Sequence, residues 1–333
     1  MNSNCYKILA IDGGGIKGLY SAVILSHFED RFGPIHRHFN LICGTSTGGI
    51  IALALASGIK ASEVVRFYTE MGPKIFPYHN KWRRKFHFGK SLLFTSKYKD
   101  IALKSALEGV FGDRRVGDCS TNVLIPTFNI TTGEPYVFKS DHVPALTRDK
   151  DRLLTDVALA TSAAPTYFPI AEMQTMKGTE QFIDGGVWAN NPSLLGITEF
   201  LTHYNDDNRY HNYALLSVSS LNERVRFPDH LKVKKRMSFF KWNQDLFSLM
   251  IDSQSGATHN FINYLLRSSV GGEYLRIPST ELTPAQKGYI SLDYACKKSL
   301  KIMEQKGMEK AIEWIDKAEL QAFFEVNNKE ATA

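Results

Sequence analysis

Short apolar runs alternate with longer amphipathic segments along the first two thirds of the chain. The apolar runs predict buried strands at 7–12, 39–43, 123–129, 136–139 and 214–219. Apolar residues at helical spacing predict helices between them, at 18–32, 47–57, 61–71, 101–111 and 153–164. Because parallel strands are joined through long crossover connections, this alternation predicts an α/β fold with a mainly parallel central sheet.

The pattern changes beyond about residue 230. Segments 239–266 and 297–325 carry charges around an apolar stripe and show little strand signal between them. No internal repeat or linker-like tract divides the chain. We therefore expect an α/β domain at 1–221 and a helical C-terminal region at 222–333, which is the natural place for a regulator to act.

Composition excludes several classes of protein. The chain has 333 residues, 43% of them hydrophobic and 22% charged, which excludes a disordered or collagen-like chain. Its four cysteines form no Cys-x-x-Cys pair and no cluster with histidine, so we expect neither a disulfide framework nor a metal site. The longest apolar stretch, 48–59, is well short of the ~20 residues that cross a bilayer. A soluble cytoplasmic protein without a cofactor is expected.

The net charge of +6 is concentrated in two short windows. Window 81–104 holds eight Lys or Arg residues against one Asp, and window 224–241 holds seven against one. Aromatic residues lie among them, and this combination suits an anionic membrane surface or a phosphorylated ligand. The alternative is two solvated segments. The candidates for membrane or ligand contact are Trp82, Arg83, Arg84, Lys234, Lys235 and Arg236.

The first motif with chemical content is the run Asp12-Gly13-Gly14-Gly15-Ile16-Lys17-Gly18. It joins a predicted strand to a predicted helix. Three glycines allow positive φ and close backbone approach, and their amides point toward whatever lies at the helix N-terminus. Such a loop can hold a phosphate or stabilise an oxyanion.

Three nucleotide-binding interpretations compete for this loop. Gly13, Gly15 and Gly18 match G-x-G-x-x-G, but the second strand ends in Gly44-Thr45 and lacks the acidic residue that holds a ribose. A Walker A loop needs Lys-Ser/Thr after its last glycine, which Leu19-Tyr20 does not supply. The phosphate-binding turn of actin-like sugar kinases stays open as an alternative.

The second motif is Gly44-Thr45-Ser46-Thr47-Gly48-Gly49, between the strand at 39–43 and a helix of small residues. This is G-x-S-x-G at a strand-to-helix turn. A serine there takes a strained backbone and exposes its Oγ at the positive end of a helix, which suits a nucleophile. The alternative is a glycine-rich turn with a capping serine.

The third motif, Asp184-Gly185-Gly186, follows a short apolar run. Alone it is typical of a turn. The segment 190–192, Asn-Asn-Pro, predicts a turn and a cap for a helix at 193–203.

Together, and in this order, the three motifs resemble the patatin-like phospholipase family. Segments 160–168 and 188–192 are similar too, so the resemblance covers roughly 5–220. It implies a three-layer α/β/α fold that hydrolyses acyl esters of lipids with a Ser–Asp dyad. Ser46 would be the nucleophile and Asp184 the base. The other matching positions are Gly13, Gly14 and Gly15 for the oxyanion hole, and Asp12, Lys17, Gly18, Gly44, Gly48, Gly185 and Gly186 as motif support. One departure concerns the subfamily only: 217–221 reads Ser-Val-Ser-Ser-Leu where the family often carries Leu-Gly-Thr-Gly.

The resemblance also suggests partners. A bacterial subgroup of similar size and layout acts as anti-phage effectors switched on by cyclic oligonucleotides. It implies a phospholipid membrane surface and a cyclic dinucleotide activator as partners, a homo-oligomer, and a place at the inner face of the membrane when active. No nucleic-acid polymer is expected, because the positive charge is local and no binding motif is present.

Catalysis would proceed by acyl transfer. An ordinary carboxylate, with a pKa of ~4, is a weak base toward serine, so we expect a desolvated site. We expect Lys17 to act on the start of the helix, with a contact to a lipid phosphate as the alternative, and Asp12 to orient the glycine loop by accepting amide hydrogen bonds. The alternatives are a Ser-His-Asp esterase and a non-catalytic nucleotide-binding regulator. The histidines that follow Asp184, as the esterase order requires, are His203, His211, His230 and His259.

Overall fold

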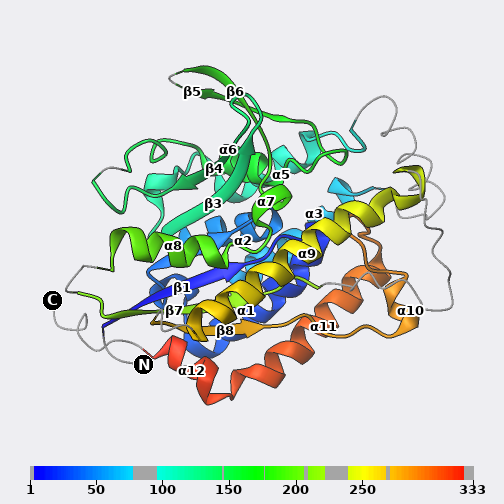
Figure 1. The fold of residues 1–333 in the computed structure, drawn as a ribbon. Coiled ribbons are helices and arrows are strands. Elements are labelled where there is room, and N and C mark those ends of the chain that lie inside the picture. The colour runs from blue at the N-terminus through cyan, green and yellow to red at the C-terminus, as the bar shows by residue number, and fades with distance from the viewer. Residues whose placement is uncertain are drawn as a thin grey trace.

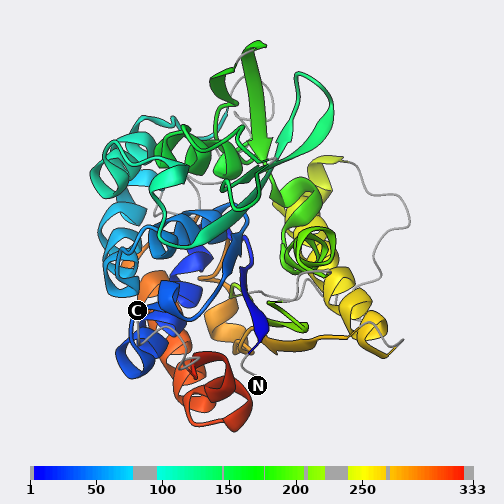
Figure 2. The same cartoon turned by 90° about the vertical axis from the view of Figure 1, so that its left-hand side faces the viewer.

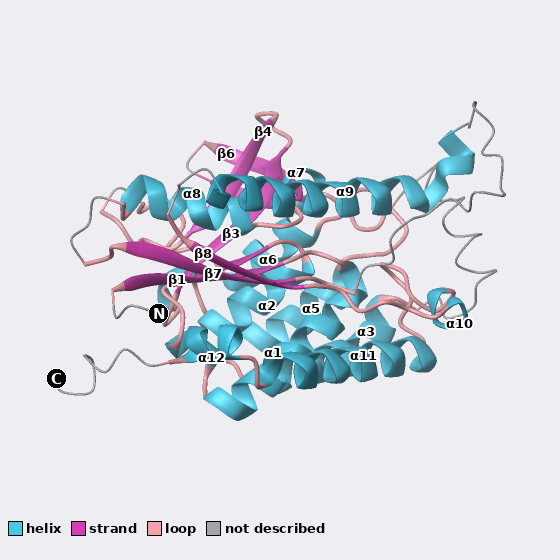
Figure 3. Ribbon diagram, turned by 60° about the horizontal axis from the view of Figure 1, so that its bottom comes forward, coloured by secondary structure: helices cyan, strands magenta, loops and turns pink. Residues whose placement is uncertain are grey.

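One mixed sheet of eight strands lies between two layers of helices (Figures 1 and 3). The computed structural model describes residues 4–77, 96–144, 146–175, 177–205, 209–221, 239–267 and 271–325. The strand order is β5-β6-β3-β2-β1-β7-β8, with β4 paired to β3. This confirms the three-layer α/β/α fold and its central sheet.

The parallel and antiparallel pairings occupy different parts of the sheet and meet at β3. The parallel strands are β1 (Cys5–Ile11), β2 (Leu41–Gly44), β3 (Asn122–Asn129), β7 (Asn212–Val218) and β8 (Glu273–Ile277). The antiparallel strands are β4 (Glu134–Lys139), β5 (Ala171–Thr175) and β6 (Gly178–Asp184). The β3–β4 and β5–β6 links are too short for a crossover, so these neighbours can pair only as hairpins.

Side chains on alternate residues of β1 fill two separate cores. Leu9 and Ile11 belong to the larger core, whereas Tyr6, Ile8 and Ala10 face the smaller one. A strand buried on both faces needs apolar residues at most positions, which explains the apolar run at 8–11; Lys7 is the buried exception.

Helices cover both faces of the sheet (Figure 3). On the side of the larger core lie α1 (Gly18–Phe32), α2 (Thr47–Ala56), α3 (Ala61–Ile75), α5 (Ile101–Phe111), α6 (Leu154–Ser162), α11 (Lys297–Ile315) and α12 (Ala318–Phe324). On the other side lie α7 (Gly186–Ala189), α8 (Ser193–His203) and α9 (Phe239–Arg267). The short α10 (Pro284–Lys287) lies in the connection between β8 and α11.

The C-terminal region departs from the helical prediction. Strand β8 lies within it and pairs in parallel with β7, extending the same sheet. Met303 of α11 and Phe323 of α12 are buried in the larger core, and α11 packs beside α1, as Figure 2 also shows. The described part of 222–333 therefore completes the α/β layers, because β8 pairs with the edge of β7 and α11 packs against α1.

Membrane crossing has no candidate in the part of the chain that the structure describes. None of its helices is both long and apolar enough to span a bilayer.

Candidate active site

Ser46 occupies the turn between β2 and α2. Its backbone has φ 54° and ψ −125°, a left-handed conformation that is strained for a residue with a side chain. The Ser46 amide donates to Thr161 Oγ1 at 3.0 Å, and that hydroxyl donates to the Pro126 carbonyl at 2.7 Å. These contacts hold the turn predicted from G-x-S-x-G and keep the Ser46 side chain toward the third motif.

Asp184 lies at the end of β6 and contacts the serine directly. Ser46 Oγ donates to Asp184 Oδ2 at 2.6 Å, and the Gly186 amide donates to Asp184 Oδ1 at 2.6 Å. Asp184 is only 3% exposed. Burial raises the pKa of Asp184 to about 6, although the hydrogen bonds from Ser46 and Gly186 act in the opposite direction. The carboxylate is therefore a better proton acceptor than an exposed aspartate.

The glycine loop supplies fewer free amides than expected. The Gly13 amide donates to the Asn190 carbonyl at 3.0 Å, so Gly13 is not available to an oxyanion, and its predicted role was wrong. The amides of Gly14 and Gly15 have no hydrogen-bond partner among the described residues, and both line the cavity that contains Ser46. Gly15 has φ 59° and passes so close to Leu292 that a Cβ would lie 2.2 Å from its carbonyl oxygen. Only glycine fits this part of the loop.

The glycine loop and the turn at Ser46 contact each other directly. Thr47, directly after the serine, donates its hydroxyl to the Gly15 carbonyl at 2.7 Å. A Cβ on Gly18 would lie 1.8 Å from Thr47 Cγ2, so the two helix starts pack closely. This contact places Gly14 and Gly15 beside the strained serine.

Asp12 and Lys17 lie deeper than the sequence suggested. The Asp12 carboxylate pairs with the Arg276 guanidinium at 2.5 Å and is fully buried. In place of the expected amide hydrogen bonds from the loop, the Arg276 guanidinium donates to both oxygens of Asp12. Lys17 is 5% exposed and acts electrostatically on Asp252 of α9.

The cavity at Ser46 is narrow, with a volume of about 60 Å³, and its walls are mostly apolar. Helices α2, α3, α5 and α9 and the loop after α6 contribute to it. The apolar residues in its lining are Ile16, Ile50, Phe67, Tyr68, Ile75, Phe76, Leu103, Ala164, Tyr167, Phe168, Ile251 and Leu292. Such walls suit a hydrocarbon chain and keep water from the carboxylate.

The histidines of the triad alternative have other partners. His259 Nδ1 is 3.0 Å from the Tyr274 hydroxyl, and His203 lies 3.5 Å from Glu199. The backbone of His211 bonds to Asn4, whereas His230 lies outside the described residues. No histidine in the described ranges contacts Ser46 or Asp184.

The residues predicted to contact a membrane or a ligand lie outside the described residues. They are Trp82, Arg83, Arg84, Lys234, Lys235 and Arg236. Within the described residues, no group of three His, Cys, Asp or Glu side chains is placed to hold a metal ion.

Sequence reasoning missed several residues that hold the site. Thr161 supports the Ser46 backbone, and Asn190 contacts Gly13. Both lie in segments that resemble the patatin-like family, 160–168 and 188–192, and this resemblance was the available signal. Their partners are more than a hundred residues away along the chain, so no local pattern identifies the contacts.

Comparison with known proteins agrees with this geometry. The family model described as "Patatin-like phospholipase" matches residues 9–195, more than half of the chain. The chain belongs to the patatin-like phospholipase family. A Pseudomonas aeruginosa protein named "cGAMP-activated phospholipase" is 35% identical over 292 residues, covering 86% of this chain and 82% of that protein. An Escherichia coli protein of the same name is 31% identical, covering 96% and 92%. "Patatin-like protein 2" of Arabidopsis thaliana is 32% identical, covering 92% and 83%.

Proposed function

We propose that this patatin-like protein is a lipid acyl hydrolase of the phospholipase A type, with a Ser46–Asp184 dyad. The 2.6 Å hydrogen bond from Ser46 Oγ to the buried carboxylate carries the proposal, because it joins a strained serine directly to a base. The apolar cavity beside it favours a fatty acyl chain over a small polar ester.

The reaction follows from these contacts. Ser46 Oγ attacks the ester carbonyl carbon while Asp184 Oδ2 accepts the hydroxyl proton. The amides of Gly14 and Gly15 stabilise the oxyanion, and loss of one such donor typically costs ~3–4 kcal/mol. The lysophospholipid leaves with the proton from Asp184, and a fatty acyl ester remains on Ser46. Water then attacks that ester with Asp184 again as base, which releases the fatty acid and restores the serine.

The alternatives explain less of the site. An actin-like sugar kinase has no use for the Ser46–Asp184 hydrogen bond, and its prediction rested on the glycine loop alone. A non-catalytic nucleotide-binding regulator has no use for a strained serine.

We further propose that a cyclic dinucleotide activates the enzyme at a phospholipid membrane surface, in the manner of an anti-phage effector. The support is that relatives in Pseudomonas aeruginosa and Escherichia coli, similar over most of the chain, are named "cGAMP-activated phospholipase". Basic windows 81–104 and 224–241 are the candidates for contact with lipid headgroups or with the activator, and 222–333 is the candidate regulatory region. A homo-oligomer belongs to the same proposal.

The test is fatty acid release from phosphatidylglycerol/phosphatidylethanolamine vesicles, with and without a panel of cyclic dinucleotides. We expect release by the wild type and none by Ser46→Ala. Ser57→Ala, at the other end of α2, is the matched control and should behave as wild type. Equal release by wild type and Ser46→Ala would refute the dyad. Release that no nucleotide changes would refute the activation.

A further inference from the structure

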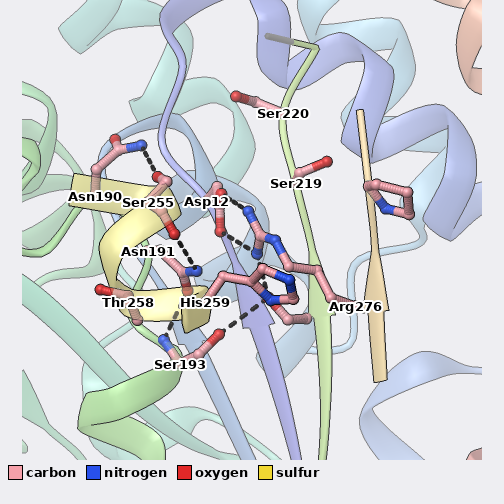
Figure 4. A network of polar contacts seen from close by, with 12 residues as sticks. Asp12, Asn190, Asn191, Ser193, Ser219, Ser220, Ser255, Thr258, His259 and Arg276 are labelled. Carbon is pink, nitrogen blue, oxygen red and sulfur yellow. Dashed lines mark hydrogen bonds and ion pairs between the residues drawn. The ribbon is translucent and has the colours of Figure 1, made fainter. Parts of the chain in front are cut away.

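A buried polar network joins α9 to the glycine loop (Figure 4). Asn190 Nδ2 donates to the Ser255 hydroxyl of α9 at 2.9 Å, and the Asn190 carbonyl accepts the Gly13 amide at 3.0 Å. One residue earlier on α9, Gln254 Oε1 accepts the Asn191 amide at 2.9 Å. Two hydrogen bonds therefore separate α9 from the loop that bears the oxyanion hole.

The other half of the network comes from β7 and β8. Arg276 of β8 donates to Asp12 Oδ1 at 3.2 Å and to Oδ2 at 2.5 Å. Ser220, just after β7, donates to the Gly13 carbonyl at 2.9 Å. Burial raises the pKa of Asp12, whereas Arg276 and the Ser255 hydroxyl lower it, so Ser255 interacts with Asp12 as well as with Asn190.

The contact between α9 and this end of the sheet is made by polar groups, although an apolar contact would avoid the free-energy cost of desolvating them. Ser255 is 3% exposed and Asn190 1%, so their polar groups are desolvated and depend on each other. Hydrogen bonds are directional, whereas apolar contacts allow sliding. The network thus holds both the amide and the carbonyl of Gly13.

A run of three glycines has no side chains to hold its shape. Gly14 and Gly15 must nevertheless present their amides to a developing oxyanion, and a displacement of about 1 Å can cost roughly 100-fold in rate. Since Gly13 is the first residue of this run, fixing it limits the conformations of the other two.

We infer that Ser255 and Arg276 are positioning residues for the oxyanion hole. Both lie beyond 9–195, the part of the chain that the family model matches. The C-terminal third therefore supplies support without which the catalytic loop is poorly held. The kinetic tests of this inference rest on the proposed hydrolase function, whereas the hydrogen-exchange test does not.

The decisive variant is Ser255→Ala, assayed on a soluble p-nitrophenyl ester. We expect kcat to fall roughly 10- to 100-fold with KM changed less than about 3-fold, since the loop acts in the transition state. Affinity for a trifluoromethyl ketone, whose serine adduct bears an oxyanion, should weaken by the same factor as kcat/KM. Ser255→Thr retains the hydroxyl and should recover most of the rate.

Ser299→Ala is the matched control. Ser299 of α11 is fully buried, like Ser255, but its hydroxyl has no hydrogen-bond partner among the described residues. We expect wild-type kinetics from this variant. An equal loss of kcat in both variants would overturn the inference, because any buried serine would then have the same effect.

Amide hydrogen exchange of the peptide covering 10–17 gives a readout that needs no turnover. We expect faster exchange in Ser255→Ala and in Arg276→Lys, which retains the charge but loses the forked contact with Asp12. Unchanged exchange in both variants would overturn the inference. If the wild type shows no Ser46-dependent hydrolysis, the proposed function fails, and the exchange measurement still decides the role of Ser255 and Arg276.

Discussion

Asp184 acquires its chemical character from its surroundings. An aspartate in water has a pKa of ~3.9 and binds a serine proton too weakly to be an effective base. Burial at the end of β6 raises the pKa of Asp184 to about 6, and the Ser46 hydroxyl lies 2.6 Å from it. The same burial that makes the carboxylate more basic also lets protons deactivate it at mildly acidic pH.

The pH dependence of hydrolysis follows directly. The proposed dyad needs ionised Asp184, so kcat/KM should fall as pH drops through about 6 and stay on a plateau above it. The measurement is kcat/KM on a soluble ester between pH 4 and 9. An activity loss centred near pH 4 would show that the site is open to water.

The Asp184→Asn variant separates function from stability. We expect no measurable hydrolysis from it, because an amide cannot accept the proton. Because the folded-state pKa of Asp184 is raised, ionisation above pH 6 destabilises the fold, and this penalty is relieved as pH falls toward ~4. The variant should therefore gain stability relative to wild type at pH 8 more than at pH 5, measured by urea unfolding.

The elements around Ser46 meet at very short range. Helix α2 begins directly beside the end of β1, and a Cβ on Gly48 would lie 2.3 Å from the Ile11 carbonyl oxygen. The close packing of α2 against β1 therefore also holds the turn that carries Ser46. Small residues at this point keep the serine in reach of Gly14 and Gly15.

A pair of glycine substitutions tests this close approach. Gly48→Ala forces α2 away from β1, and we expect a loss of roughly 1–3 kcal/mol in unfolding free energy together with most of the activity. Gly109 in α5 has no atom within 4 Å of the added Cβ, so Gly109→Ala should instead stabilise by about 0.5–1 kcal/mol. Chemical denaturation of both variants gives the comparison. Equal effects would contradict the packing argument.

At the scale of the whole molecule, buried ion pairs join distant parts of the chain. The Lys97 ammonium pairs with Asp293, and both side chains are almost fully buried. Asp293 also accepts the Tyr98 hydroxyl at 2.9 Å. A buried pair of this kind is costly to break, because one charge is left without compensation.

The Lys97→Met variant measures the cost of breaking this connection. We expect a loss of about 3–5 kcal/mol in unfolding free energy, since the buried Asp293 carboxyl loses its cationic partner. The pair of Lys306 and Glu309 on α11 is much more exposed, so Lys306→Met should cost less than about 1 kcal/mol. Thermal melts at one pH compare the two. A small effect of Lys97→Met would show that water reaches Asp293.

Local pattern predicted most of the elements and the turn that carries Ser46, whereas only the resemblance to the patatin-like family implied a role for Asp184. The helices at 18–32 and 101–111 have the predicted bounds, and Ser46 lies on the predicted turn. These features follow from residues adjacent in sequence: apolar runs long enough to form strands, and glycines that permit a tight turn. Three strands, β5, β6 and β8, were not predicted. Strands β5 and β8 lie at the edges of the sheet and bury too little to show a clear pattern, and the first two residues of β6 are exposed.

Tertiary structure decided which groups meet. Asp12 and Arg276 are 264 residues apart, and the Gly13 amide donates to the carbonyl of Asn190, 177 residues away. Neither partner could be read from spacing, because a hydrogen bond depends on where strands and helices cross in space. The residue types, in their local order, predicted a hydrolase site, whereas only the packing of β8 and α9 against the sheet determined how its glycine loop is held.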